Sequence, residues 1–157
     1  MLIKMATLFG LGHLSKAPGT LGSLATLPLC YVLLKLGPLV YMAMTVVITL
    51  LAIVAAERYE RQCGKHDSKE IVIDETVGML VTMTWLPMTW QSFVIGFVLF
   101  RALDIIKPFP VSYFDRHVPG GFGVVADDLV AGIIASVLMQ LMLHHTAWLG
   151  VQIQNFG

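Results

Sequence analysis

The chain has 157 residues, of which 57% are hydrophobic and only 13% charged, and its ten basic and ten acidic residues give a formal net charge of zero. A neutral chain lacks the basic surface on which nucleic-acid binding depends, so we expect no nucleic-acid partner. The length suits one domain, and two isolated cysteines provide no disulfide framework. We therefore predict a single domain over residues 1–157 that is unusually rich in apolar segments.

Four tracts without charged residues divide the chain, at about residues 21–34, 36–56, 76–100 and 129–150. A helix needs about 20 apolar residues to cross a bilayer core of about 30 Å, and the second and fourth tracts exceed that length. This pattern predicts an all-α fold, a multi-pass integral membrane helical bundle with short re-entrant or interfacial helices. The alternative is a soluble protein with a very apolar helical core.

Basic residues near the tracts predict the orientation of the chain in the membrane. Lys4 and Lys16 place the N-terminus in the cytoplasm, Gly37-Pro38 indicates a turn between the first two tracts, and a basic cluster at residues 58–69 returns to the cytoplasm. Pro87 interrupts the third tract, so we expect two short helices that enter and come back rather than one span. The last tract then crosses once.

A glycine-rich segment, residues 9–23, opens into the first apolar tract. Thr20 is a natural N-cap, and the free backbone amides at a helix start bind anions such as phosphate, here with Lys16 beside them. The residue order of a Walker loop is absent. The alternative is a cap and turn that only begins a membrane helix.

Paired carboxylates stand at the entrance to the third tract, where Asp74 is followed by Glu75. Two adjacent acids beside a membrane are costly unless a positive group holds them, and Mg²⁺ prefers such hard oxygen ligands. The alternative is an Asp that caps the helix and a Glu that complements the helix dipole.

A third motif follows the third tract, with Arg101, Asp104 and Lys107 spaced three residues apart. At that spacing they share one face of a helix, which Pro108 then ends. This predicts a structural ion network, or an acid that binds metal while the two cations hold phosphate oxygens. Asp127 and Asp128 repeat the paired arrangement at the mouth of the last tract.

All these acids lie at the edge of an apolar tract, and the re-entrant topology brings them to one membrane face. Such a cluster can bind one or two Mg²⁺ ions, polarise a phosphoryl group and activate water as the nucleophile. Cysteine phosphatase chemistry is not expected, because Lys69 stands where the C-x₅-R loop after Cys63 needs arginine. A membrane transporter or ion-handling protein that uses the acidic cluster remains the alternative, together with a small scaffold subunit.

Three motifs in order resemble the phosphatidylglycerophosphatase A family: APGTLGS at 17–23, HDSKEIVIDETVGM at 66–79 and FRALDIIKPFPVSYFDRHVPGGFGVVADDLVAG at 100–132. The resemblance runs from about residue 9 to residue 135. It implies a Mg²⁺-dependent, multi-pass enzyme of the bacterial inner membrane with its active site on the cytoplasmic side. The implied reaction hydrolyses the terminal phosphate of phosphatidylglycerophosphate, surrounded by bilayer lipids, to phosphatidylglycerol and inorganic phosphate.

The resemblance also implies a site made of acids and of phosphate-binding groups. As catalytic residues we expect Glu75, Asp104 and Asp128. As Mg²⁺ ligands we expect Asp74, Glu75, Asp104, Asp127 and Asp128. As substrate phosphate-binding residues we expect Lys16, Gly19, Thr20, Gly22, Ser23, Arg101 and Lys107.

Overall fold

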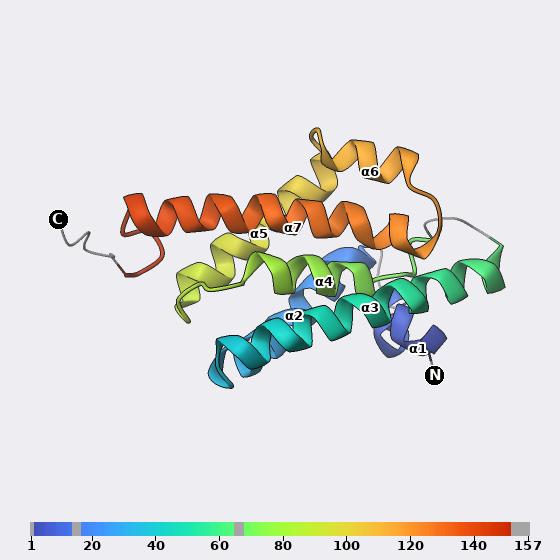
Figure 1. Ribbon diagram of the computed structural model, residues 1–157, viewed down its shortest axis with the longest axis horizontal. Helices are drawn as coiled ribbons and strands as arrows, with labels where there is room; N and C mark the ends of the chain where they lie inside the picture. Colours follow the sequence, from blue (N-terminus) through green and yellow to red (C-terminus); the bar gives the residue numbers. More distant parts are fainter. Residues whose placement is uncertain (1, 14–16, 65–67, 152–157) are drawn as a thin grey trace.

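The computed structural model describes residues 2–13, 17–64 and 68–151, and over these residues the only regular elements are helices (Figure 1). In chain order they are α1 (Leu2–Ala6), the 3-10 helix η1 (Leu8–His13), α2 (Pro18–Lys35), α3 (Pro38–Cys63), α4 (Ile73–Thr82), α5 (Trp90–Ile106), α6 (Val111–His117) and α7 (Gly120–His145). The predicted all-α class is confirmed.

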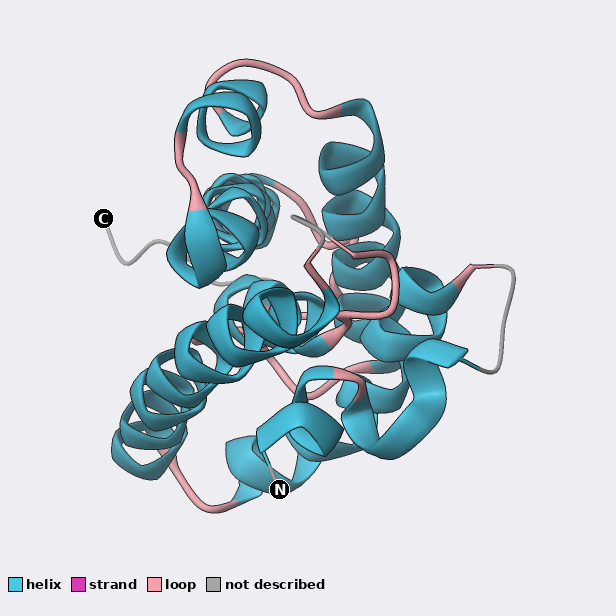
Figure 2. Cartoon of the chain, turned by 90° about the vertical axis from the view of Figure 1, so that its right-hand side faces the viewer, coloured by secondary structure: helices cyan, strands magenta, loops and turns pink. Residues whose placement is uncertain are grey.

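The long helices run back and forth between two ends of the molecule. The turns between α2 and α3 and between α4 and α5 lie at one end, and the N-terminal segment, the start of α4 and the whole of α6 lie at the other (Figure 1). Figure 2 turns this second end toward the viewer. α7 packs against α3, α4, α5 and α6, and α4 lies between α7 and the pair formed by α2 and α3.

The predicted turn at Gly37-Pro38 is confirmed. α2 ends at Lys35, and Gly37 has a φ of 99°, a left-handed conformation that glycine adopts without strain. Pro38 is the first residue of α3, a position where a missing backbone N–H removes no helical hydrogen bond.

The third apolar tract forms two helices that double back, as expected from Pro87. α4 ends at Thr82 and α5 begins at Trp90, so the end of α5 returns to the start of α4. The linker between them exposes backbone carbonyls, and the side-chain amide of Gln140 in α7 donates a hydrogen bond of 3.1 Å to the carbonyl of Thr84. The neighbouring helix α7 thereby satisfies one backbone carbonyl of this non-helical linker.

Two expected helix starts are wrong. Thr20 is not an N-cap, because α2 already begins at Pro18, whose fixed φ suits a first helical turn. Asp127 and Asp128 do not stand at the mouth of the last helix, because α7 begins at Gly120 and includes both. The glycines before them form helix rather than a flexible loop, and a Cβ on Gly121 would overlap the backbone of α3 at Ile53.

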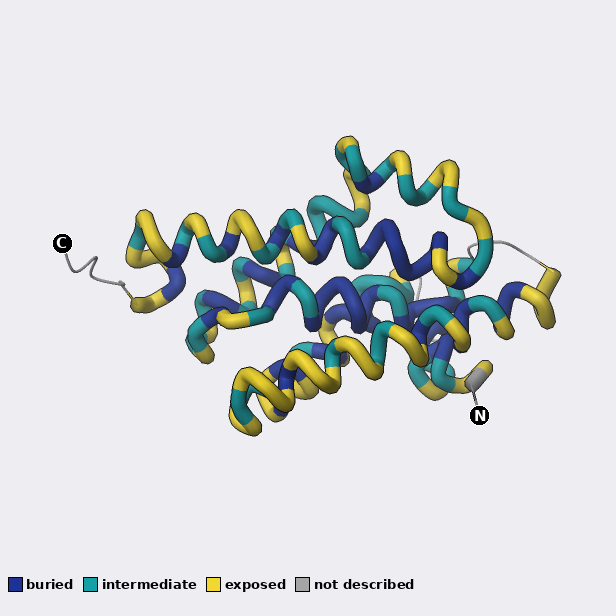
Figure 3. The backbone as a smooth tube through the Cα atoms, in the orientation of Figure 1, coloured by how far each residue is buried: buried dark blue, intermediate teal, exposed yellow. Residues whose placement is uncertain are grey.

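Within the described residues, α3 and α7 are the helices long and apolar enough to cross a membrane. Each has 26 residues, and α3 leaves large apolar side chains such as Leu39 and Leu50 mostly exposed. Figure 3 shows the buried residues concentrated in α4 and in the first half of α7, while α3 is largely exposed. Buried apolar residues form two clusters, one that includes Cys30, Tyr41 and Leu143 and one that includes Ile71, Ile73 and Val77 beside the start of α4.

Candidate active site

A cavity of about 240 Å³ lies at the end of the bundle where α2 and α4 begin and α5 ends. Its lining is strongly charged, and carboxylates outnumber cations by five to three. The carboxylates are Asp74, Glu75, Asp104, Asp127 and Asp128, and the cations are Lys69, Arg101 and Lys107. All five predicted metal-binding acids therefore reach one cavity, although they come from three helices.

Three of these carboxylates form the tightest group. Glu75 of α4, Asp104 of α5 and Asp128 of α7 each place one oxygen so that the three atoms lie within 4.8 Å of one another. Glu75 and Asp128 are buried and Asp104 is half-buried. Ionised carboxylates this close repel one another unless a cation compensates them, and an all-oxygen donor set fits Mg²⁺.

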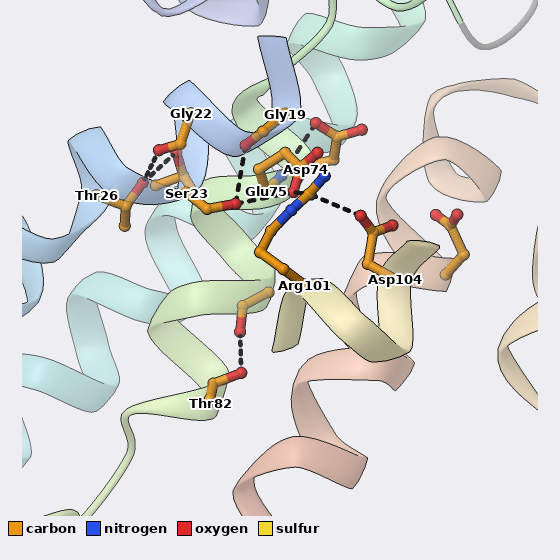
Figure 4. Close-up of polar contacts among 12 residues, drawn as sticks. Gly19, Gly22, Ser23, Thr26, Asp74, Glu75, Thr82, Arg101 and Asp104 are labelled. Atoms are coloured by element: carbon orange, nitrogen blue, oxygen red, sulfur yellow. Dashed lines mark hydrogen bonds and ion pairs between the residues drawn. The ribbon is translucent and has the colours of Figure 1, made fainter. Parts of the chain in front are cut away.

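Arg101 holds two of the three acids, as Figure 4 shows. Its Nη1 donates a hydrogen bond of 2.6 Å to Oδ2 of Asp104 and a second hydrogen bond to Oε2 of Glu75. Its Nε is buried and has no hydrogen-bond partner within the described part of the chain. Because an unpaired buried donor is costly, this N–H indicates that a ligand with an oxygen acceptor completes the site.

The Glu75 carboxylate is fixed from several sides. Arg101 and Ser23 both donate to its Oε2, the Ser23 hydroxyl at 3.1 Å. The backbone N–H of Glu75 donates to Oδ1 of the neighbouring Asp74 at 3.0 Å. Burial, followed by the negative charge of Asp104, raises the pKa of Glu75 to about 7, against the opposing effects of Arg101 and Ser23. The metal-free site therefore holds a proton near neutral pH more readily than an ordinary glutamate does.

The glycine-rich motif supports this carboxylate through α2. Gly19 lines the cavity, and a Cβ there would overlap the Glu75 carboxylate, so a larger residue would displace that carboxylate from its present position. Ser23 lies one turn further along, and its hydroxyl can donate to the Gly19 carbonyl or to Glu75. Gly22 packs against Val72, where a Cβ would lie 3.1 Å from the carbonyl oxygen.

The predicted phosphate-binding residues separate into three groups. The described lining of the cavity includes Gly19, Arg101 and Lys107, but it does not include Thr20, Gly22 or Ser23. Ser23 instead contacts a carboxylate. Lys16 lies outside the described residues.

Lys107 departs from the predicted arrangement. Arg101 and Asp104 share a helix face as expected, but α5 ends at Ile106 and Lys107 has a left-handed φ of 47°. Its ammonium therefore reaches Asp115 of α6 and, at 2.7 Å, Oδ2 of Asp127 in α7. Burial alone lowers the pKa of Lys107, but the hydrogen bonds to both acids raise it above its usual value.

Sequence reasoning gave no role to Asp115 or Lys69. Asp115 lies in α6, and only the fold of the segment after Pro108 brings it to Lys107. Lys69 lies in a turn closed by a 2.8 Å hydrogen bond from the Ile71 N–H to the Ser68 carbonyl, and it lines the cavity. Its place inside the second motif, five residues before Asp74, is the signal that could have identified it.

Comparisons with known proteins identify relatives of this chain. A model of the phosphatidylglycerophosphatase A family matches residues 4–143. The chain is 38% identical over 142 residues to phosphatidylglycerophosphatase A of Escherichia coli, covering 90% of this chain and 83% of the relative. It is 39% identical over 137 residues to phosphatidylglycerophosphatase A of Haemophilus influenzae, covering 86% and 84%.

A third relative carries a different name. It is a Bacteroides thetaiotaomicron protein named as a candidate phosphatidylinositol-3-phosphatase, 34% identical over 145 residues, with 87% of this chain and 90% of the relative covered. No solved structure matches the chain. The family match spans every segment that lines the cavity, from α2 to α7. The chain belongs to the phosphatidylglycerophosphatase A family.

Proposed function

We propose that this chain is a lipid phosphatase that hydrolyses the terminal phosphate of phosphatidylglycerophosphate to phosphatidylglycerol and inorganic phosphate. The names of the two relatives at 38% and 39% identity support this substrate. One structural observation carries the chemistry. Three carboxylate oxygens lie within 4.8 Å of one another beside an arginine whose buried Nε has no partner among the described residues.

The cofactor that we propose is Mg²⁺, held by Glu75, Asp104 and Asp128. The donor set fits, because all three side chains offer oxygen atoms and the cavity lining carries two more acids than cations. Asp74 and Asp127 line the same cavity and complete the negative field around the ion. When bound, such an ion compensates negative charge on phosphoryl oxygens and lowers the pKa of water.

The cations of the cavity bind and orient the substrate phosphate. Arg101 has its Nε–H available for a phosphate oxygen while Nη1 remains on Glu75 and Asp104. Lys107 adds a second positive charge from the C-terminal end of α5, held there by Asp115 and Asp127. Both charges stabilise the negative charge that develops on the phosphoryl group in the transition state.

The carboxylates also handle the proton of the attacking water. Water forms a new bond to phosphorus, the bond from phosphorus to the glycerol oxygen breaks, and one water proton passes through a carboxylate to that oxygen. The carboxylates that we propose for this proton transfer are those of Glu75, Asp104 and Asp128, whose oxygens lie within 4.8 Å of one another. Gly19 and Ser23 position Glu75, so the first motif supports the chemistry from behind the carboxylate.

For location, we propose a multi-pass protein of the bacterial inner membrane with the cavity on the cytoplasmic side. The apolar α3 and α7 support a membrane setting. Basic residues gather at the cavity end, with Arg58 and Arg61 at the end of α3 and Lys69 and Lys107 at the cavity, whereas Lys35 lies at the opposite end. Cytoplasmic segments of membrane proteins carry this excess of lysine and arginine.

The test is phosphate release from phosphatidylglycerophosphate in detergent micelles by the purified chain, with Mg²⁺ and with EDTA. We expect release that disappears with EDTA and in Asp128→Asn, while circular dichroism shows an unchanged helix content. Phosphatidylinositol 3-phosphate is the second substrate, chosen because of the Bacteroides relative. Faster hydrolysis of that lipid would overturn the substrate assignment, and no release from folded wild type would favour the transporter or scaffold alternatives.

A further inference from the structure

Two apolar grooves mark the surface of the helical bundle away from the charged cavity. The α2–α5 groove, about 460 Å³, is lined by residues of α2 and of the start of α5, among them Leu27, Tyr31, Phe93 and Val94. The α4–α7 groove, about 380 Å³, is lined by residues from the end of α4 to the end of α7, among them Val137. Neither groove has a role in the chemistry described above.

The α2–α5 groove lies on the same two helices that border the cavity. Gly19 of α2 and Arg101 of α5 line the cavity, and Leu27 and Val94 line the groove. Leu27 is eight residues from Gly19, about 12 Å along the helix, and Val94 is seven residues from Arg101, about 10 Å. A headgroup layer is about 5–8 Å thick, so a lipid whose phosphate lies in the cavity has its acyl chains at the depth of this groove.

The surface between cavity and groove is open and apolar. Leu24 of α2 is 44% exposed and Val98 of α5 is 58% exposed, and both lie between the cavity residues and the groove residues of their helix. A hydrocarbon chain can therefore follow α2 and α5 without crossing a charged side chain. Apolar surface of this kind favours an apolar ligand over water.

The α4–α7 groove lacks such a connection, because α4 and α7 touch through their backbones between the cavity and the groove. A Cβ on Gly132 of α7 would lie 2.5 Å from the carbonyl oxygen of Gly78 in α4. Both glycines lie between the acids Glu75 and Asp128 and the groove residues Val81 and Ile133. The contact between the two backbones therefore blocks an acyl chain from passing between α4 and α7 from the cavity to the α4–α7 groove.

We propose that the α2–α5 groove binds an acyl chain of the same lipid molecule whose terminal phosphate lies in the cavity. This inference rests on the proposed lipid phosphatase function. The enzyme then binds two parts of its substrate, the terminal phosphate in the cavity and a hydrocarbon chain along α2 and α5. The groove then contributes to substrate binding and leaves the chemical step unchanged.

The test compares two valine-to-tryptophan variants that fill one groove each. Val94→Trp fills the α2–α5 groove, and Val137→Trp is the matched control, since the two valines are 51% and 55% exposed on their helices. Each variant is assayed with dihexanoyl and with dipalmitoyl phosphatidylglycerophosphate in the same mixed micelles. For Val94→Trp we expect KM for the dipalmitoyl lipid to rise about four- to fifteen-fold, the loss of one or two buried methylene groups at about 0.8 kcal/mol each.

The dihexanoyl lipid reports whether each variant is folded and active. We expect both variants to keep the wild-type kcat on it, and Val137→Trp to keep the wild-type KM on the long-chain lipid. Equal effects of the two variants, or a long-chain defect only in Val137→Trp, would overturn the groove assignment. If Val94→Trp loses activity on both lipids, Leu27→Trp on the α2 wall takes its place, and an equal loss there overturns the proposal. No release from wild type would instead overturn the phosphatase function, and this inference with it.

Discussion

Two ion clusters share one cavity, and they differ in burial and in charge. The Arg101 cluster consists of Arg101, Glu75, Asp104 and Asp128, and the Lys107 cluster consists of Lys107, Asp115 and Asp127. The Arg101 side chain is 13% exposed, whereas that of Lys107 is 28% exposed. The buried cluster has three acids for one cation, so it is the one that needs a further positive ion. The more exposed Lys107 cluster has two acids for one cation, so its charge is closer to neutral, and it is more accessible to water.

The largest expected effect on activity comes from neutralising an acid of the Arg101 cluster, compared with neutralising an acid of the Lys107 cluster. Glu75→Gln keeps the shape of the side chain but removes one charged oxygen donor from the three-carboxylate group. We expect phosphate release to fall by about 10²–10³-fold, the usual result of losing one preorganised group that stabilises charge. The measurement is kcat for phosphatidylglycerophosphate, together with Mg²⁺ affinity by titration calorimetry.

Asp115→Asn is the matched control for that variant. Asp115 contacts Lys107 but is not among the cavity-lining residues, and such partly exposed ion pairs contribute about 1 kcal/mol or less. We expect less than a tenfold loss of kcat and unchanged Mg²⁺ affinity. Equal losses in both variants would mean that the two clusters act as a single unit.

The cations provide the second comparison, in which each is exchanged for the other type. Arg101→Lys keeps the charge but removes Nε and the Nη1 that donates to both Glu75 and Asp104, so we expect about a 10–100-fold loss of kcat/KM. Lys107→Arg keeps a cation between Asp115 and Asp127, and we expect kcat/KM to stay within a few-fold of wild type. The reverse order of effects would contradict the assignment of the unpartnered Nε to phosphate.

The third prediction concerns pH and stability without metal. The pKa of Glu75 rises from the usual 4.5 to about 7 in the fold, so the folded chain binds this proton more tightly than the unfolded chain does. Stability from this group is therefore lost as pH rises from about 4.5 through 7. In EDTA we expect a lower melting temperature at pH 8 than at pH 5, with Mg²⁺ restoring more stability at pH 8.

Glu75→Gln is the control for the pH experiment, since glutamine does not titrate. We expect its melting temperature in EDTA to depend less on pH than that of wild type. If wild type and Glu75→Gln depend on pH equally in EDTA, the pKa of Glu75 is not raised in the metal-free fold.

The smallest expected effect is at the cavity mouth. Lys69 lines the cavity and is exposed, so Lys69→Gln should raise KM by about two- to fivefold, typical of an exposed charge, and leave kcat unchanged. Lys4→Gln removes an exposed lysine that does not line this cavity. If both variants change KM equally, the effect comes from general attraction of the anionic micelle surface.

Much of the site could be predicted because charge and hydropathy determine it locally. Pro87 within an apolar tract predicted the doubling back, and the doubling back predicted that Glu75 and Asp104 lie at the same face of the membrane. The acids that converge on the cavity follow from the same argument, since an uncompensated acid is costly inside the bilayer.

Other features depend on neighbours that the sequence does not specify. The glycines before Asp127 are typical of a flexible loop. In the structure, α3 passes so close to Gly121 that a side chain there would overlap the α3 backbone. Lys107 follows the helical spacing of Arg101 and Asp104, yet its partner is decided by where α6 places Asp115. The sequence predicts that Ser23 binds phosphate, but in the structure its hydroxyl contacts the Glu75 carboxylate, whose position the sequence does not give.

The backbone contact between Gly78 and Gly132 also determines how the site can move. Glu75 lies three residues before Gly78, and Asp128 lies four residues before Gly132, so each acid is about one turn from the point where α4 and α7 touch. Two helices in direct backbone contact have no soft side chains between them to deform. We therefore expect the distance between these acids to change little during turnover, and the movement that admits a lipid and releases phosphate to occur at the end of α5, where Lys107 reaches Asp115 and Asp127 through a long side chain.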